Sequence, residues 1–300
     1  MAEKVKIHFL GTSDSVPSAG RNHPSIWLSY ERENILIDCG EGTQRQIRKA
    51  RLNPCRITRI LITHWHADHI LGIPGLLKTL GMSGYNRTLH IYGPRGTKRK
   101  LESLRDLFGV REEYPIKVKE VSGKFLEEDD FYIESEEMTH GTPCNAYSFV
   151  LKGKTRIDKK KIEKFKIPTG PHMKKLKEGK DITYKGKKYS AKNLTYTEEG
   201  KRVSIVLDTA LNERIAPFVK ESDVFVSEST FDSGHEDKAR EYKHLTSEQA
   251  ARIAKKAKVK KLYLIHVSQR FSKNFKAVLQ EAKKVFKETS LPKDLDSVEV

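Results

Sequence analysis

Cysteine is scarce in this chain, and long apolar runs are missing. The 300 residues contain 3 cysteines, Cys39, Cys55 and Cys144, whose spacing fits neither a zinc finger nor a redox motif. So few cysteines exclude a disulfide-built scaffold and favour a reducing, cytoplasmic setting. No apolar run approaches the ~18 residues that a membrane helix needs. The first ten residues also lack the apolar centre of a secretory signal, so we expect no association with a membrane.

Acidic residues are outnumbered by basic ones. Lys and Arg total 57 against 40 Asp and Glu, so the net charge is +17. This excess favours a polyanionic partner such as nucleic acid, although a thermophile's charged surface has a similar composition. The distribution of the charge favours the polyanionic partner, because residues 152–202 alone hold 18 basic and 6 acidic residues, a net charge of +12. With little sustained periodicity, this stretch predicts an inserted basic arm; the alternative is a solvated, disordered insertion.

Short apolar runs that end in a polar residue recur along the chain. They end at Asp38, His64, Asp208, Glu228 and His266. Runs of this kind are typical of strands buried on both faces. Helical patterns lie between them at 43–52 and 71–80, and a capping box at 246–249 opens a helix that runs to about Val259. This alternation predicts a layered α/β architecture in a single domain, residues 1–300, with the arm inserted in it.

The strongest motif is the segment from Thr63 to His69. Four metal-capable side chains fall within six residues: His64, His66, Asp68 and His69. At a strand end, residues i and i+2 point the same way, so His64 and His66 can share one ion. Asp68 and His69, at the start of the next helix, can face a neighbouring ion. Imidazole and carboxylate ligands suit Zn²⁺, and also Mn²⁺ or Fe.

This motif resembles the HxHxDH signature of the metallo-β-lactamase superfamily. The superfamily adds a further His, a bridging Asp and a last His at strand ends, matched here by His140, Asp208 and His266. The resemblance implies an αββα sandwich of two mixed β-sheets flanked by helices, with two Zn²⁺ ions per chain. It implies that one ion is held by His64, His66 and His140, the other by Asp68, His69 and His266, and that Asp208 bridges both. Asp38 is then expected to orient these ligands from behind.

Three further segments are similar to the ribonuclease Z family of tRNA 3′-processing endonucleases. They are the loop 11–17 with the Arg-Asn pair after it, the Gly-Pro segment of the arm, and the histidine-containing block 244–251. The last ligand is also followed by the family's Ser and Arg. The substrate-binding residues implied by this resemblance are Arg21, Asn22, Gly170, Pro171, Lys174, Lys175, Ser268 and Arg270.

The resemblance implies the activity as well. Precursor tRNA would be cleaved by water at its 3′ side, leaving a 3′-hydroxyl on the tRNA and a 5′-phosphate on the trailer. Asp68 would orient or deprotonate that water, and His244 would donate a proton to the leaving oxygen with Glu228 as its partner. Members are usually homodimers, so we expect one here. Ser227 stands where the family usually has His, a departure that bears on how a tRNA 3′ terminus is handled.

Other functions remain open at this point. A small-molecule phosphodiesterase or thioesterase would need no basic arm. An RNA-binding protein on a degenerate scaffold would be expected to lose metal ligands, whereas all seven are present. An exonuclease or mRNA-processing nuclease would carry a large cap domain. Within the arm, Tyr184, Tyr189 and Tyr196 either stack on RNA or pack among themselves.

Overall fold

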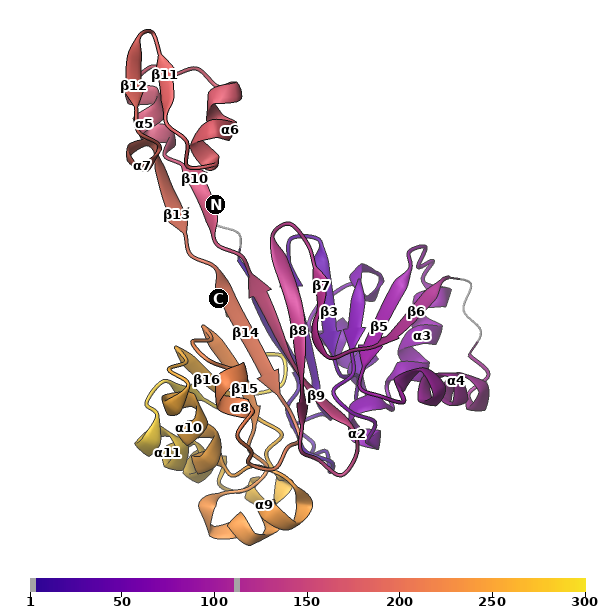
Figure 1. Ribbon diagram of the computed structural model, residues 1–300. Helices are drawn as coiled ribbons and strands as arrows, with labels where there is room; N and C mark the ends of the chain where they lie inside the picture. The colour runs from indigo at the N-terminus through magenta and orange to yellow at the C-terminus, as the bar shows by residue number, and fades with distance from the viewer. Residues whose placement is uncertain (1–3, 111–113) are drawn as a thin grey trace. The chain divides into compact units, whose positions relative to one another are not determined.

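The computed structural model describes residues 4–110 and 114–300, and the chain forms two compact units (Figure 1). Unit 1 comprises Met1–Glu127, Ile133–Phe149 and Arg202–Val300, and unit 2 comprises Glu128–Tyr132 and Val150–Lys201. Among the described helices, none combines the length and apolar character needed to cross a membrane.

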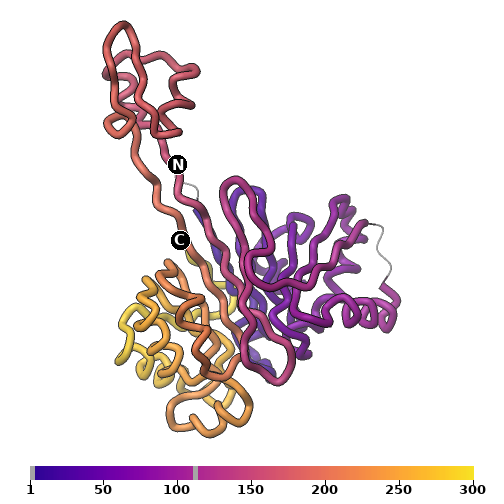
Figure 2. Tube along the Cα trace, in the orientation of Figure 1, coloured from indigo at the N-terminus to yellow at the C-terminus, as the bar shows by residue number. Residues whose placement is uncertain are grey.

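The first of two seven-stranded sheets in the described residues is built mainly from the N-terminal part of the chain. In spatial order its strands are β18 (Ser297–Glu299), β1 (Lys6–Gly11), β2 (Ser25–Tyr30), β3 (Glu33–Ile37), β4 (Arg59–Leu61), β5 (Leu89–Gly93) and β6 (Ile116–Glu120). Strands β1 to β3 are antiparallel and β3 to β6 are parallel, so the sheet is mixed. The last strand, β18, pairs with β1, which brings the two ends of the described chain together (Figure 2).

The second sheet contains the later strands. In spatial order they are β17 (Thr289–Ser290), β16 (Lys261–Ile265), β15 (Val224–Glu228), β14 (Lys201–Val206), β9 (Cys144–Leu151), β8 (Phe131–Met138) and β7 (Gly123–Glu127). Strands β14 to β17 are parallel. The two sheets meet face to face: the ring centroids of Phe9 and Tyr263 lie 5.5 Å apart, and those of Tyr30 and Phe149 lie 5.8 Å apart.

Helices flank the two sheets, and some lie beside the ends of the strands (Figure 1). They are α1 (Thr43–Lys49), α2 (Ala67–Ile70), α3 (Ile73–Met82), α4 (Thr97–Leu107), α8 (Ile215–Phe218), α9 (Glu236–Tyr242), α10 (Ser247–Lys256) and α11 (Phe275–Val285), with 3-10 turns η1 (Pro54–Arg56), η2 (Ser233–His235) and η3 (Gln269–Phe271). Leu76 and Leu80 of α3 share a buried cluster with Leu36 of β3, and Ala250 of α10 shares another with Phe225 of β15. Burial on both faces explains the nearly continuous apolar runs of the central strands.

The elements expected from the sequence are present with shifted ends. The capping box of Thr246 and Gln249 is confirmed, because both of its reciprocal hydrogen bonds are made. Helix α1 ends at Lys49, short of the expected residue 52, because Arg51 takes a left-handed backbone with φ of 58°. Within the strand predicted over 57–63, only the residues of β4 form a regular strand. The amide of Thr63 donates to the Asp38 carboxylate and not to a neighbouring strand.

Unit 2 has a small core of its own. Its elements are β10 (Lys154–Ile157), α5 (Lys159–Lys164), α6 (Pro171–Lys177), β11 (Ile182–Tyr184), β12 (Lys187–Tyr189), α7 (Ala191–Leu194) and β13 (Thr195–Glu198). The core consists of Ile162, Ile167, Leu176, Ile182, Ala191 and Leu194. Tyr184 and Tyr189 pack against it, whereas Tyr196 is exposed. Elements of three to seven residues are too short to show sustained periodicity in the sequence.

Candidate metal centre and its surroundings

Strands of unit 1 end in side chains that form the candidate site. Asp38 follows β3, Asp208 lies just beyond β14, and His266 follows β16. All three have a left-handed backbone, with φ of 56°, 51° and 56°. Residues other than glycine adopt this conformation infrequently, and it occurs more often at functional sites, where the direction of a side chain matters. The chain therefore turns sharply at three residues expected in the site.

Seven His and Asp side chains converge in two overlapping groups. One group is His64, His66, His140 and Asp208, the other is Asp68, His69, Asp208 and His266, and within each the donor atoms lie within 4.8 Å of one another. Asp208 belongs to both. Its Oδ2 lies 3.5 Å from Nε2 of both His64 and His69, and its Oδ1 lies 3.3 Å from Nε2 of His266. These clusters of imidazole and carboxylate donors fit a metal site.

Two atoms at the centre of these groups lack a hydrogen-bond partner within the described residues. They are Nε2 of His69 and Oδ1 of Asp208, and both are buried. A buried polar atom without a partner costs roughly 1–3 kcal/mol. A divalent cation would satisfy both atoms at once, so the residues present fit a bound metal.

The protonation states of His64, His66 and Asp208 suit coordination. Burial lowers the pKa of His64 and of His66, so their rings are neutral and offer a lone pair. Burial alone would raise the pKa of Asp208, but the charges of His266 and His69 outweigh it and hold the pKa well below its usual range. Asp208 is therefore ionised.

A layer of hydrogen bonds holds the donors from behind. Asp38 Oδ2 accepts from His69 Nδ1 at 2.6 Å and from the Thr63 hydroxyl at 2.7 Å, while its Oδ1 accepts from the Thr63 amide at 2.7 Å. His266 Nδ1 lies 2.8 Å from the Thr230 hydroxyl, and His140 Nδ1 lies 3.1 Å from a backbone carbonyl. Such bonds leave the other ring nitrogen facing the metal position.

We expect Asp38→Asn to weaken zinc binding by about 10- to 100-fold, the usual cost of losing a partner that orients a metal ligand. Asparagine keeps the size of the side chain and tolerates the left-handed backbone, so the fold should persist. Titration against a competing chelator measures the affinity, and a circular-dichroism melt reports folding.

Asp294→Asn is the matched control for this variant. Asp294 also accepts hydrogen bonds from a threonine hydroxyl and a backbone amide, but its partners are Thr12 and Asn22 and not a metal donor. Its replacement should leave zinc affinity unchanged. Equal losses of affinity in both variants would contradict the orienting role of Asp38.

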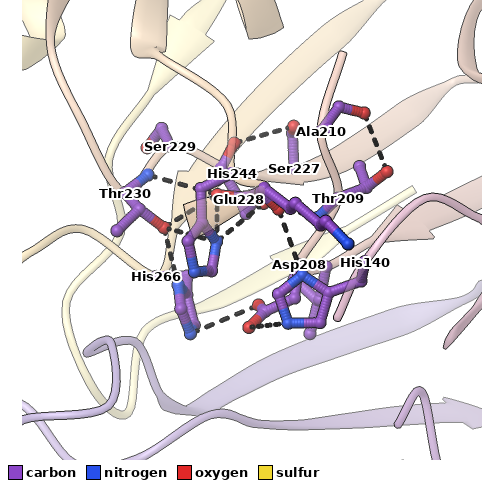
Figure 3. A network of polar contacts seen from close by, with 12 residues as sticks. His140, Asp208, Thr209, Ala210, Ser227, Glu228, Ser229, Thr230, His244 and His266 are labelled. Carbon is purple, nitrogen blue, oxygen red and sulfur yellow. Dashed lines mark hydrogen bonds and ion pairs between the residues drawn. The ribbon is translucent and has the colours of Figure 1, made fainter. Parts of the chain in front are cut away.

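His244, Glu228 and Thr230 form a bonded group beside Asp208 and His266 (Figure 3). Glu228 is fully buried; its Oε1 accepts from the Thr209 amide and its Oε2 from the Thr230 hydroxyl, both at 2.7 Å. His244 Nδ1 lies 3.1 Å from both carboxylate oxygens. Burial lowers the pKa of His244, but the Glu228 carboxylate outweighs it and raises the pKa to about 9. His244 is therefore protonated at neutral pH.

An open pocket of about 340 Å³ lies beside His244. Ser268 and Arg270, both expected from the sequence to contact substrate, line it. Arg270 Nε donates to the Ser268 hydroxyl at 3.3 Å, and its guanidinium lies 5.0 Å from the centre of the Phe231 ring. Phe231 and Tyr242 also line this pocket, and neither was singled out in the sequence. Their only sequence signal is position, directly after residue 230 and two residues before His244.

Arg21 does not line this pocket, and its contact with substrate stays a prediction. It is 7% exposed, and its Nη1 donates to the Thr12 hydroxyl at 2.5 Å and to the Pro292 carbonyl at 2.9 Å. Asn22 is likewise bonded, with its Nδ2 donating to the Glu41 carbonyl at 2.6 Å. Enclosure of the guanidinium gives Arg21 a structural role: it ties the loop after β1 to the C-terminal segment.

The remaining expected substrate contacts belong to unit 2. Gly170 precedes α6 and Pro171 begins it, while Lys174 and Lys175 lie within it, and all four are exposed. Their contact with RNA stays a prediction. Ser227, which replaces the family's usual His, is fully buried, and its hydroxyl donates to the Glu228 carbonyl at 2.9 Å.

Comparison with known proteins identifies the family. The family model of the metallo-β-lactamase superfamily matches residues 19–154. Ribonuclease Z of Nanoarchaeum equitans is 38% identical over 293 residues, which cover 98% of this chain and 92% of that protein. Ribonuclease Z of Methanothermobacter thermautotrophicus is 38% identical over 298 residues, with 99% and 97% covered.

A solved structure supports the same fold. The crystal structure of the short form of human tRNase Z matches with a TM-score of 0.71 and 24% identity, and 98% of each chain is covered. The predicted sandwich of two mixed sheets flanked by helices is thereby confirmed. The chain belongs to the ribonuclease Z family, the metal-dependent endoribonucleases of the metallo-β-lactamase fold.

Proposed function

We propose that this protein is a zinc-dependent endoribonuclease that cleaves precursor tRNA at its 3′ side and removes the 3′ trailer. The tRNA product carries a 3′-hydroxyl and the trailer carries a 5′-phosphate. The observation that carries the proposal is the convergence of seven donors around Asp208, beside a protonated His244, in a chain 38% identical to proteins named ribonuclease Z.

Two zinc ions per chain are proposed for the two donor groups. His64, His66 and His140 would hold one ion, Asp68, His69 and His266 the other, and Asp208 would serve both. Zinc is preferred because it binds this mixture of imidazole and carboxylate ligands well. Metal ions held there would lower the pKa of a water molecule and neutralise charge on the phosphate.

Asp68 would orient the attacking water. Its Oδ2 lies 3.2 Å from Nε2 of His69 and 3.4 Å from Nε2 of His266. Burial raises the pKa of Asp68, but the charge of His69 and the close approach of both histidines outweigh it and hold the pKa below its usual range. An ionised carboxylate accepts hydrogen bonds only, so Asp68 can align a water proton while the water oxygen faces phosphorus.

His244 serves the other side of the reaction. As the water oxygen bonds to phosphorus, the bond from phosphorus to O3′ breaks, and O3′ needs a proton. His244 Nδ1 is held by Glu228, so Nε2 is the nitrogen that can donate this proton. Loss of the proton leaves the neutral ring oriented by the same carboxylate, ready to be protonated again from solvent.

The basic charge of residues 152–202 supports an RNA substrate. This stretch has a net charge of +12 and none of the proposed metal donors. Its contribution is binding through phosphate contacts, which release counterions and depend on salt rather than on base sequence. A small-molecule hydrolase would have no use for it. We also infer a cytoplasmic homodimer, in line with the family and with three free cysteines.

Replacing residues 155–198 with a short Gly-Ser bridge should separate binding from chemistry. Lys154 faces Glu198 in the β10–β13 ladder, and Glu198 directly precedes Glu199, so a short bridge can join Lys154 to Glu199. Hydrolysis of a small chromogenic phosphodiester should be unchanged. Binding of precursor tRNA should weaken, and the slope of log affinity against log salt should flatten by about one unit for each phosphate that the arm no longer binds.

A melt and a zinc measurement are the controls for this deletion. Unit 2 has its own core, so its removal should leave the core of unit 1 intact. A folded, zinc-loaded deletion variant with normal tRNA affinity and salt slope would contradict a role of the arm in binding.

The function itself is tested by comparing substrates. Purified, zinc-loaded protein should cleave a 3′-extended tRNA precursor with far higher kcat/KM than a small phosphodiester or a thioester. The reverse preference would favour a small-molecule hydrolase and overturn the proposal.

A further inference from the structure

Part of the lining of the pocket beside His244 consists of aromatic side chains that are not metal donors. The rings of Phe231 and Tyr242 both line it, with centroids 6.4 Å apart and planes 18° from parallel. The Arg270 guanidinium covers the Phe231 ring, whereas Tyr242 is 56% exposed. Unpaired RNA bases stack on aromatic rings and on arginine planes. This part of the lining is therefore suited to a nucleobase.

Another part of the pocket lining is held in shape by its own hydrogen bonds. It is formed by residues 14–16 of the loop after β1. Asp14 Oδ1 accepts from the Val16 amide at 3.1 Å, and the Ser13 hydroxyl donates to the Val16 carbonyl at 2.9 Å. Arg21 anchors the same loop from behind. A pocket formed in advance loses little conformational freedom when a ligand enters.

The position of His244 decides which nucleotide enters the pocket. This assignment rests on the proposed function, in which His244 protonates the leaving O3′. A general acid must lie within hydrogen-bond reach of the atom that it protonates. The ribose that carries O3′ therefore lies at His244, and its base is one glycosidic bond away from a pocket that His244 itself lines. The nucleotide on the trailer side is attached through the phosphate, farther from this histidine.

We propose that Phe231, Tyr242 and Arg270 form a subsite for the base of the nucleotide immediately 5′ to the cleaved bond. Tyr242 supplies the open stacking face, and Arg270, fixed by its bond to Ser268, supplies the second plane. The subsite sets the register of the strand, because a stacked base places one O3′, and no other, beside the general acid.

A cycle of enzyme and substrate changes tests the subsite. Tyr242→Ala should lower kcat/KM for a tRNA precursor by about 10- to 100-fold, within the range for one stacked base. Tyr242→Phe keeps the ring and should retain nearly full activity. An abasic ribonucleotide 5′ to the cut should lower the wild-type rate by a similar factor. With this substrate, Tyr242→Ala should cause little further loss. Zinc content and melting temperature should match the wild type.

Each remaining outcome overturns the subsite. Additive losses from Tyr242→Ala and the 5′ abasic position would show that the ring and that base do not meet. If the loss from Tyr242→Ala were instead non-additive with the loss from an abasic position 3′ to the cut, the pocket would bind a base of the trailer. Failure of the wild-type protein to cleave the intact precursor would overturn the proposed function and the subsite with it, whereas efficient wild-type cleavage with additive losses overturns the subsite alone.

Discussion

Replacing Asp208 with asparagine or alanine should remove at least one zinc ion per chain and slow precursor cleavage by about 10³-fold or more, since metal stabilisation of the transition state is worth several kcal/mol. Asp208 is the one side chain shared by both donor groups, and its two oxygens face His64, His69 and His266. Elemental analysis of the purified variants gives the metal content, and a gel assay gives the rate.

The two substitutions at Asp208 separate ligand loss from backbone strain. Asparagine tolerates the left-handed backbone at φ of 51°, whereas alanine is strained there. Both variants should lose metal, and only the alanine variant should also lose stability through strain. An asparagine variant that keeps two zinc ions and the wild-type rate would contradict the bridging role.

Replacing His244 with alanine should slow cleavage by roughly 10²- to 10⁴-fold, the usual contribution of a general acid. Zinc content and RNA affinity should remain close to those of the wild type, because His244 belongs to neither of the two donor groups around Asp208. His90→Ala is the matched control, since His90 lies on β5 outside the site and should not affect the rate. A His244→Ala variant that loses zinc or cleaves normally would contradict the assigned role.

The pH profile adds a second readout for His244. As an acid, His244 acts only while protonated, so its contribution is present below its pKa and is lost as the pH rises through it. Glu228 is the main group that raises this pKa. Glu228→Gln removes that charge and should therefore move the alkaline limb of the rate profile to lower pH. An unchanged limb would show that another group donates the proton.

The metal centre was predictable from the sequence because much of it is local. Four donors fall between His64 and His69, and the strand and helix around them have strong apolar patterns. His140, Asp208 and His266 became recognisable only through the family resemblance, since one polar residue at a strand end carries little information alone. The left-handed backbone at Asp208 and His266 leaves no trace in residue spacing.

Features built from distant segments could not be predicted in this way. Arg21 is enclosed because it bonds to Thr12 and Pro292. Pro292 is far from Arg21 in the sequence, so residue patterns near Arg21 do not reveal this contact. The pocket beside His244 likewise joins three distant segments, around residues 14–16, 230–244 and 268–270. The similarity of this loop to the ribonuclease Z family implied substrate contact for Arg21, whereas tertiary packing encloses its guanidinium.

The central claim is tested most directly by the chemistry of the two new RNA ends. Zinc-loaded protein is incubated with a labelled, 3′-extended tRNA precursor, and both products are sequenced with their terminal groups determined. We predict one cut at the 3′ side of the tRNA, a 3′-hydroxyl on the tRNA and a 5′-phosphate on the trailer. A 2′,3′-cyclic phosphate on the tRNA, or degradation from the 3′ end without a single internal cut, would contradict the account.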